Sequence, residues 1–221
     1  MDQHVLIEGL IDFLAFIAFV ALHEFAHAWM AVRLGDDTPR MQGRLTIDPI
    51  AHIDLVGTIL LPLGLVVFSA FGGSTMSLCG WGKPVQVNPN NFGVRRRDDM
   101  LVAFAGPFMN LLIAFVMLGM MRGGIFLGIK ALDDITLLNV VRLSVFLCFF
   151  NLLPIPPLDG AHILRNFLNI SDEVYAQISN YSFLFIIILL RVPEIAGAVG
   201  LFSSKVTILL ARGFGWHLVL S

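Results

Sequence analysis

Charged residues are scarce in this sequence of 221 residues: Asp, Glu, Lys and Arg together make up 14%, whereas 57% of the residues are hydrophobic. The formal net charge is −2, and the basic residues are scattered apart from Arg95, Arg96 and Arg97, so the chain lacks the basic face that nucleic-acid binding needs. With a mean hydropathy of +0.84, it also lacks the polar shell of a soluble domain. We therefore expect an integral membrane protein in contact with the lipid bilayer, with no nucleic-acid partner.

Cysteine is also scarce, because Cys79 and Cys148 are the only two in the chain. They are far apart and neither belongs to a Cys-x-x-Cys pair, so the sequence indicates neither a disulfide nor a thiolate metal site. The first ten residues, MDQHVLIEGL, contain no basic region and no small-residue cleavage site. We therefore expect the first hydrophobic run to be retained as a membrane helix and not removed as a signal peptide.

Long hydrophobic runs cover most of the chain and predict an all-α bundle of about five to six transmembrane helices, since one crossing needs about 20 apolar residues. We expect a single membrane-embedded domain, residues 1–221. The expected spans are 8–32, 99–121, 135–153 with a continuation to about 168, 174–192 and 195–213. The last two, within 174–213, are expected to be accessory helices.

The insertion 35–98 mixes turn-forming residues with one further apolar run at 55–71. Its fragments 41–47 and 84–88 partly alternate in polarity and are bounded by Gly, Pro and Asn, which is typical of short β-strands. Pro62 lies near the middle of the apolar run, so we expect a re-entrant or interfacial segment, or a hairpin, and not a full crossing. An ordinary extra helix that tolerates its proline is the alternative.

Basic residues predict the orientation, because Lys and Arg favour the cytoplasmic side of short loops. The region between the first two expected spans contains Arg33, Arg40, Arg44, Lys83, Arg95, Arg96 and Arg97. We therefore expect this region on the cytoplasmic side, and Arg165, just after the third span, falls on the same side.

The segment HEFAH places three ionisable residues in an otherwise apolar helix. His23 and His27 are four residues apart, so both imidazoles project from one face of the helix and can bind one metal ion. Glu24 suits a general base that takes a proton from a water molecule activated by that metal. Zinc is the expected cofactor, one ion per chain, because imidazole and carboxylate ligands suit it. Simple packing is disfavoured, because each ionisable group near mid-bilayer costs at least about 2.5–3.5 kcal/mol.

A catalytic zinc site needs a third protein ligand. The candidates are Asp159, His162 and His52, with Asp48 and Asp54 behind them. Asp159 is favoured because it ends the stretch NLLPIPPLD, whose prolines must break the helix and leave backbone groups to be satisfied by protein or water. It also lies near the inner end of its span, at a depth comparable to that of the two histidines. Asp159 and the two histidines share this depth only if the run at 55–71 does not cross the membrane alone, because one more crossing would put Asp159 on the opposite face of the membrane.

Three motifs occur in this order: HEFAH, AGPFMN at 105–110 and NLLPIPPLDG at 151–160. They resemble the motifs of the site-2 protease family of intramembrane zinc metalloproteases. The resemblance implies that His23, His27 and Asp159 bind zinc and that Glu24 activates the water. It also implies that the three spans carrying the motifs, 8–32, 99–121 and 135–168, form the catalytic core.

The resemblance also implies that Asn110 and Asn151 lie near the site, both as candidates for contacting the substrate backbone or the developing oxyanion, with Asn151 the stronger of the two. As alternatives, Asn110 could bond a neighbouring helix and Asn151 could cap the broken backbone. His162 stands where many relatives carry arginine, and could be an interface residue, an alternative ligand or a partner of a ligand. His52 could approach the zinc as a regulatory or fourth ligand, or could pair at the interface with a nearby aspartate.

The expected substrate follows from the same resemblance: a transmembrane helix of another protein, cut within or near the bilayer. Such a helix must unwind locally, so an extended substrate stretch could pair with 41–47 or 84–88. The alternative for these two fragments is a plain connecting loop. The stretch GRLTIDPIAHIDLVGTILLPL resembles the compact prokaryotic branch of the family, and the chain has no room for the PDZ-type domain of larger relatives.

These observations together predict a multi-pass protein of a prokaryotic cytoplasmic membrane, with its active site nearer the cytoplasmic side. A homo-oligomer remains open. Two other functions compete with proteolysis, namely a membrane metal-ion transporter and a non-catalytic scaffold of the same fold. A transporter should carry further ligands on several spans, whereas the middles of the later spans hold almost none.

Overall fold

The computed structural model describes residues 2–71, 80–124, 134–182, 184–185 and 193–216. Every regular element in these ranges is a helix, so the expectation of an all-helical protein is confirmed for them. The elements are α1 (Gln3–Arg33), α2 (Thr38–Met41), the 3-10 helix η1 (Pro49–His52), the π-helical turn η2 (Leu55–Leu60), α3 (Leu61–Ala70), the 3-10 helix η3 (Pro89–Asn91), α4 (Arg95–Arg122), α5 (Asp134–Asn151), α6 (Asp159–Phe167), α7 (Asp172–Ser179) and α9 (Pro193–Gly213).

Helix α1 is a continuous rod of 31 residues. It begins where the side chain of Asp2 accepts hydrogen bonds from the backbone N–H groups of His4 and Val5, and it contains no proline to interrupt it. It ends before Gly35, which adopts a φ of 107° that other residues rarely tolerate. By length and composition, α1 and α4 are the two helices of the described ranges that could cross a membrane. They correspond to the expected spans 8–32 and 99–121.

The third expected span is divided into two helices. Helix α5 ends at Asn151 and α6 begins at Asp159, so the intervening prolines end the first helix as expected. Gly160 allows α6 to start directly against the broken stretch, because a Cβ atom there would lie only 2.2 Å from the carbonyl oxygen of Leu152. The break therefore fixes Asp159 in the first turn of a new helix.

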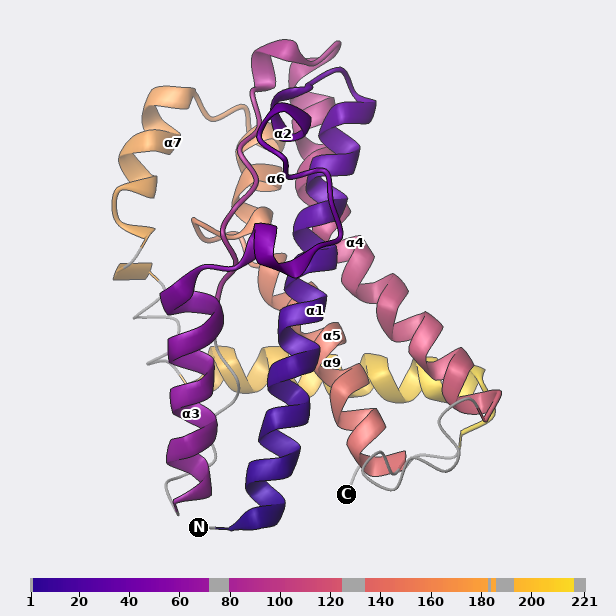
Figure 1. The fold of residues 1–221 in the computed structure, drawn as a ribbon. Coiled ribbons are helices and arrows are strands. Elements are labelled where there is room, and N and C mark those ends of the chain that lie inside the picture. The colour runs from indigo at the N-terminus through magenta and orange to yellow at the C-terminus, as the bar shows by residue number, and fades with distance from the viewer. Residues whose placement is uncertain (1, 72–79, 125–133, 183, 186–192, 217–221) are drawn as a thin grey trace.

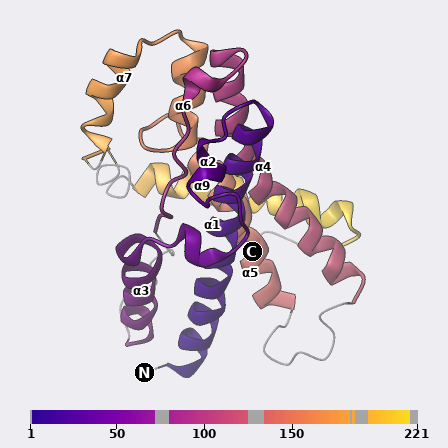
Figure 2. The same ribbon diagram turned by 45° about the horizontal axis from the view of Figure 1, so that its top comes forward.

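The apolar run 55–71 forms η2 and α3, which lie beside the N-terminal half of α1 (Figures 1 and 2). At the far end of α3, the Ala70 carbonyl accepts a hydrogen bond of 2.9 Å from the Asp2 N–H. By Trp81 the chain is back at the start of the run, since the Trp81 N–H donates to the Gly57 carbonyl over 3.1 Å. Gly57 and Trp81 therefore lie together at one end of this helical run, and Asp2 and Ala70 lie together at the other, while the expectation that the run does not cross the membrane alone stays a prediction.

The expectation of β-strands in the insertion is wrong for the described residues. Residues 41–47 are the end of α2 followed by turns, and residues 84–88 are extended without forming a strand. The extended stretch, which we call the 80–88 segment, donates to carbonyls of the short helices η1 and η2 and to carboxylates instead of to another strand. Its donors and acceptors are Trp81 to Gly57, Lys83 to His52, Val85 to the Glu24 side chain and Asn88 to the Asp36 side chain. Single bonds to different elements cannot build a ladder.

Two apolar clusters hold the long helices together. One contains Phe16 and Phe19 of α1 against Val140 and Leu147 of α5. The other joins α4, α5 and α9 through Ala114, Leu118, Met121, Leu137, Val141, Val145 and Ala211. Helix α9 covers the expected span 195–213 and runs across α5 (Figure 1).

The expected span 174–192 differs most from the structure. Helix α7 ends at Ser179 and none of its residues is buried, so it is a short surface helix. Its sequence, DEVYAQIS, is too polar to lie in hydrocarbon over its full length. The remainder of the expected span falls partly outside the described residues, and the number of membrane crossings stays a prediction.

Candidate metal centre

The two histidines of α1 lie side by side, as their spacing of four residues predicts. Each is 7% exposed, and their ring centroids are 4.6 Å apart with the rings nearly perpendicular. Their Nε2 atoms face one another across 3.0 Å. Two buried ring nitrogens are therefore aimed at a shared point.

Asp159 reaches the same point from α6. Its Oδ2 atom lies 3.2 Å from His23 Nε2, and its Oδ1 atom lies 3.3 Å from His27 Nε2. The three residues are the one group of metal-binding side chains in the described ranges whose ligand atoms all lie within 4.8 Å of one another. Residues 132 positions apart in sequence thus meet because the broken stretch before α6 brings its first turn against α1.

The donor atoms fit a tetrahedral metal ion. Zinc bonds of about 2.0–2.2 Å at tetrahedral angles place ligand atoms about 3.3–3.6 Å apart, close to the separations found here. Asp159 Oδ2 is buried and receives no hydrogen bond of good geometry from the described residues. Lone pairs converging at such distances repel one another unless a cation or a proton lies between them. The arrangement therefore suits a divalent cation with one carboxylate and two imidazole ligands.

Helix α4 sets the hydrogen-bonding state of His27. Its Nδ1 atom lies 2.7 Å from the backbone carbonyl oxygen of Val102, which can only accept a hydrogen bond. Nδ1 must therefore carry the hydrogen, and in the neutral ring this leaves a lone pair on Nε2. This is the pattern expected of a metal-binding histidine, whose second ring nitrogen donates to a carbonyl or carboxylate.

Gly106 allows the imidazoles to pack against α4. A Cβ atom at this position would lie 2.3 Å from His27 Nε2 and 2.6 Å from His23 Cε1. No side chain fits there without moving the metal-binding atoms. One turn further along, the Nδ2 atom of Asn110 lies 3.2 Å from His23 Nδ1. Asn110 thus contacts His23 directly, and its backbone carbonyl accepts a hydrogen bond from the Ser144 hydroxyl.

Glu24 lies beside the pair and is held by the 80–88 segment. The backbone N–H of Val85 donates to Glu24 Oε2 over 3.0 Å. Gly82 permits this approach, because a Cβ atom there would lie 2.5 Å from Val20 and 3.6 Å from Glu24 Cγ. One carboxylate oxygen of Glu24 is therefore oriented by a main-chain hydrogen bond from the 80–88 segment.

His52 does not join the metal-binding group. It is 1% exposed, and its Nε2 atom lies 2.9 Å from the carbonyl oxygen of Thr46. Its own carbonyl accepts the hydrogen bond from Lys83. The neighbouring aspartates cap helices: Asp48 accepts from the Ile50 N–H, and Asp54 accepts from the N–H groups of Val56 and Gly57. His52 therefore joins the turn at Thr46, through its ring, to the 80–88 segment, through its carbonyl.

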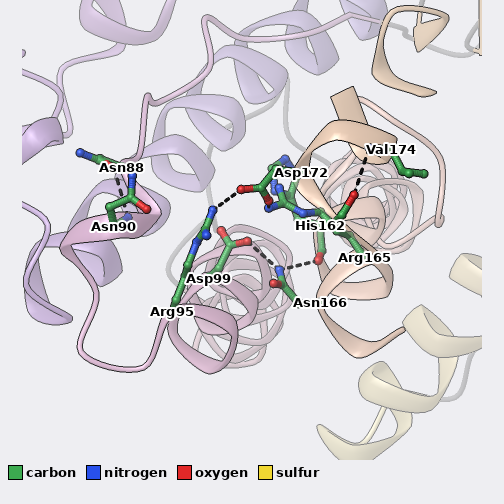
Figure 3. A network of polar contacts seen from close by, with 10 residues as sticks. Asn88, Asn90, Arg95, Asp99, His162, Arg165, Asn166, Asp172 and Val174 are labelled. Carbon is green, nitrogen blue, oxygen red and sulfur yellow. Dashed lines mark hydrogen bonds and ion pairs between the residues drawn. The ribbon is translucent and has the colours of Figure 1, made fainter. Parts of the chain in front are cut away.

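His162 also lies outside the group, in a polar network between α4, α6 and α7 (Figure 3). Its carbonyl oxygen accepts a hydrogen bond of 2.9 Å from Asn166 Nδ2, which also donates to Asp99 over 2.6 Å. Its ring contacts the ring of Tyr175, with centroids 5.2 Å apart. The His162 side chain therefore faces α7.

Asp172 anchors α7 to the rest of this network. Its carboxylate is hydrogen-bonded by both Arg95 and Arg165 (Figure 3). The hydrogen bond from Arg95, together with the charges of both arginines, holds the pKa of Asp172 below its usual value of 3.8. The carboxylate therefore stays ionised at neutral pH and keeps the start of α7 against α4 and α6.

Asn151 ends α5 and bonds its own helix. Its Nδ2 atom donates to the Leu147 carbonyl over 2.9 Å, one turn back in the same helix. Within the part of the chain that the structure describes, no contact joins Asn151 to the metal-binding group, so a role toward substrate stays a prediction. Sequence reasoning missed the carbonyl of Val102 and the N–H of Val85, since backbone contacts leave no residue-type signal. Gly106 belongs to the motif AGPFMN, but only the structure shows that it makes room for the two imidazoles.

Comparison with known proteins gives one family and several relatives. The family described as "Peptidase family M50" matches residues 128–190, which include Asn151 and Asp159. A protein of Bacillus subtilis (strain 168) named "Putative zinc metalloprotease YwhC" is 34% identical over 188 residues, which cover 80% of this chain and 78% of that protein.

Two mycobacterial proteins, both named "Putative zinc metalloprotease Rip2", are more distant. The protein of Mycolicibacterium smegmatis is 28% identical over 80% of this chain and 64% of its own length. The protein of Mycobacterium tuberculosis (strain H37Rv) is 31% identical over 80% of this chain and 65% of its own length. This chain therefore spans a little under two thirds of each. A search of solved structures finds no match.

Proposed function

Because this chain belongs to peptidase family M50, the site-2 protease family, we propose that it is a zinc metalloprotease that hydrolyses peptide bonds within or near transmembrane helices of other proteins. The observation that carries the proposal is the convergence of two imidazoles from α1 and one carboxylate from α6 beside a glutamate. The names of the relatives, which contain zinc metalloprotease, point to the same metal and the same chemistry.

The residues present divide the chemistry between them. His23, His27 and Asp159 would hold the zinc ion, which supplies a Lewis acid that lowers the pKa of water to about 7. Glu24 accepts the proton of the attacking water at a carboxylate oxygen and delivers it to the amine of the leaving peptide. The Val85 N–H donates to the Glu24 carboxylate and so holds it in orientation before the proton is transferred.

The 80–88 segment offers an edge for an extended substrate. Residues 81, 83 and 85 donate their N–H groups toward the protein, so residues 82, 84 and 86 present the opposite edge of the extended chain. No backbone hydrogen bond from that edge occurs in the described ranges. A substrate helix that unwinds next to Glu24 can add its backbone along this edge, although Pro84 contributes only a carbonyl. Asn151, at the end of α5, is a further candidate for contacting the substrate backbone.

The proposed setting is a prokaryotic cytoplasmic membrane, crossed several times by one membrane-embedded domain. In α1, His27 lies six residues before Arg33, or about 9 Å along the helix, which supports a site nearer the basic end of the helix, the end that we propose to be cytoplasmic. A transport path is less well supported, because the described residues contain a single group of metal-binding side chains.

The experiment that tests the proposal combines metal analysis with proteomics. Protein purified in detergent should contain one zinc per chain in both the parent and the Glu24→Gln variant. Membrane fractions of cells producing the parent should lose intact transmembrane proteins that accumulate with the variant. Cleavage by the variant at the parental rate would refute the role of Glu24, and a parent that binds no zinc would refute the whole proposal.

A further inference from the structure

The amide of Asn110 occupies a position that decides which nitrogen of His23 can bind metal. Asn110 is 1% exposed, and its Nδ2 atom lies 3.2 Å from His23 Nδ1. Its Oδ1 atom is buried and has no hydrogen-bond partner among the described residues. The Asn110 amide therefore has its nitrogen against His23, and its oxygen has no partner among the described residues.

Two orientations of this amide fill nearly the same space, because a rotation of 180° about the Cβ–Cγ bond exchanges its oxygen and its nitrogen. With Nδ2 toward the ring, His23 Nδ1 must accept, so the neutral ring carries its hydrogen on Nε2. That hydrogen would lie between His27 Nε2 and Asp159, where the metal belongs. With Oδ1 toward the ring, Nδ1 donates and Nε2 keeps a free lone pair.

His27 shows the arrangement that the metal requires. Its Nδ1 atom faces the Val102 carbonyl, a group that can only accept, at 2.7 Å. Val102, Gly106 and Asn110 are spaced four residues apart and therefore line one face of α4. On this face the Val102 carbonyl contacts His27 Nδ1 and the Asn110 amide contacts His23 Nδ1. Gly106 lies between them and leaves room for the two rings.

We propose that Asn110 is a positioning residue, whose Oδ1 accepts a hydrogen bond from His23 Nδ1 in the metal-loaded protein and so presents Nε2 to the zinc. The inference rests on the proposed zinc site. It assigns to Asn110 the role that the Val102 carbonyl performs for His27, and it replaces the expectation that this side chain contacts substrate. An acceptor on the second ring nitrogen raises the basicity of the first and fixes the plane of the ring.

The test measures zinc affinity in the purified full chain by competition with a chromophoric chelator. Asn110→Leu keeps the size of the side chain and removes the acceptor, so the dissociation constant should rise by about 10–100-fold. Asn110→Asp retains an acceptor and should bind zinc at least as tightly as the parent. Ser144→Ala removes the hydroxyl that bonds the Asn110 backbone carbonyl and leaves the amide in place, so its affinity should equal that of the parent.

A second measurement does not depend on the folding of a variant. In the zinc-loaded parent labelled with ¹⁵N-histidine, the spectrum should show hydrogen on His23 Nδ1. Hydrogen on Nε2, parental affinity in Asn110→Leu, or equal losses in Asn110→Leu and Ser144→Ala would each overturn the inference. A parent that fails to bind zinc would instead overturn the proposed function, so the two failures are distinguishable.

Discussion

The backbone N–H of Val85 donates a hydrogen bond to the side chain of Glu24, although the two residues are 61 positions apart in the chain. The donor comes from the 80–88 segment and the acceptor comes from the C-terminal third of α1. A backbone donor cannot be lost by a change of side chain, except by proline. The orientation of the proposed general base is therefore fixed by the course of the main chain.

Val85→Pro should lower the cleavage rate without releasing zinc. The substitution removes the N–H and frees the Glu24 carboxylate to turn, and general-base catalysis is worth about 10²–10⁴-fold. The measurement is turnover of a transmembrane model substrate together with zinc content. Val85→Ala retains the N–H and serves as the matched control. Equal activity in the two variants would show that the contact does not orient Glu24.

Asp159→Asn should weaken the retention of zinc. The change removes the anionic ligand from a site that otherwise has two neutral imidazoles, so a chelator should strip the metal from the variant at lower concentration than from the parent. Stripping the parent should abolish cleavage, and added zinc should restore it. The measurement is zinc content after dialysis against graded chelator.

The control for Asp159 is His52→Ala. His52 bonds a loop carbonyl and lies outside the metal-binding group, so this variant should keep its zinc. Equal metal content in Asp159→Asn and the parent, with loss in His52→Ala or His162→Ala, would move the third ligand to one of those histidines.

Gly106→Ala should disable the site while leaving α4 helical. The new methyl group would lie 2.3 Å from His27 Nε2, so the imidazoles must shift. Displacement of a reacting group by about 1 Å can cost about 100-fold in rate. Gly119→Ala, on the same helix, places its methyl group 3.5 Å from Phe214 in ordinary contact and should be harmless. Turnover and zinc affinity of the two variants test the contrast.

Asp36 should make the stability of the protein sensitive to acid. Burial raises the pKa of its carboxyl group, but hydrogen bonds from Thr38, Asn88 and Asn91 outweigh burial and bring the pKa below 3.8. Since the unfolded chain binds the proton more readily, the stabilisation is complete above the unfolded pKa and is lost as the pH falls through the folded value. The melting temperature of the parent in detergent should therefore fall below about pH 4.

Asp36→Asn should melt at a lower temperature at pH 7 and lose less on acidification. The variant leaves buried N–H groups without a good acceptor, which costs about 1–3 kcal/mol. Asp37→Asn is the control, because Asp37 is exposed and forms a surface ion pair with Arg40 that contributes little. Identical acid profiles for Asp36→Asn and the parent would contradict the assignment.

The sequence predicted the features that depend on spacing and composition. The run of apolar residues without proline predicts α1, and the prolines after Asn151 predict the break before Asp159. The i, i+4 histidines needed only helical geometry to fall on one face. The depth comparison that favoured Asp159 over His52 and His162 agrees with the group that the structure brings together.

The features that escaped prediction depend on tertiary contacts. Residues 84–88 have the alternation of a strand, but the N–H groups of Val85 and Asn88 donate to the carboxylates of Glu24 and Asp36, and a propensity scale does not contain that information. The span expected at 174–192 from its later apolar residues begins inside α7, a helix with no buried residue whose start is held by Arg95 and Arg165. Contacts made by main-chain atoms, such as that of Val102 with His27, are invisible in a sequence.

Both imidazoles pack against the same face of α4, and this restricts how the proposed substrate helix could enter. Parting α1 from α4 would take the partners of His23 and His27 away together and would dismantle the site at the moment of loading. We therefore expect the interface between α1 and α4 to stay closed while a substrate enters, so that entry takes place elsewhere on the protein.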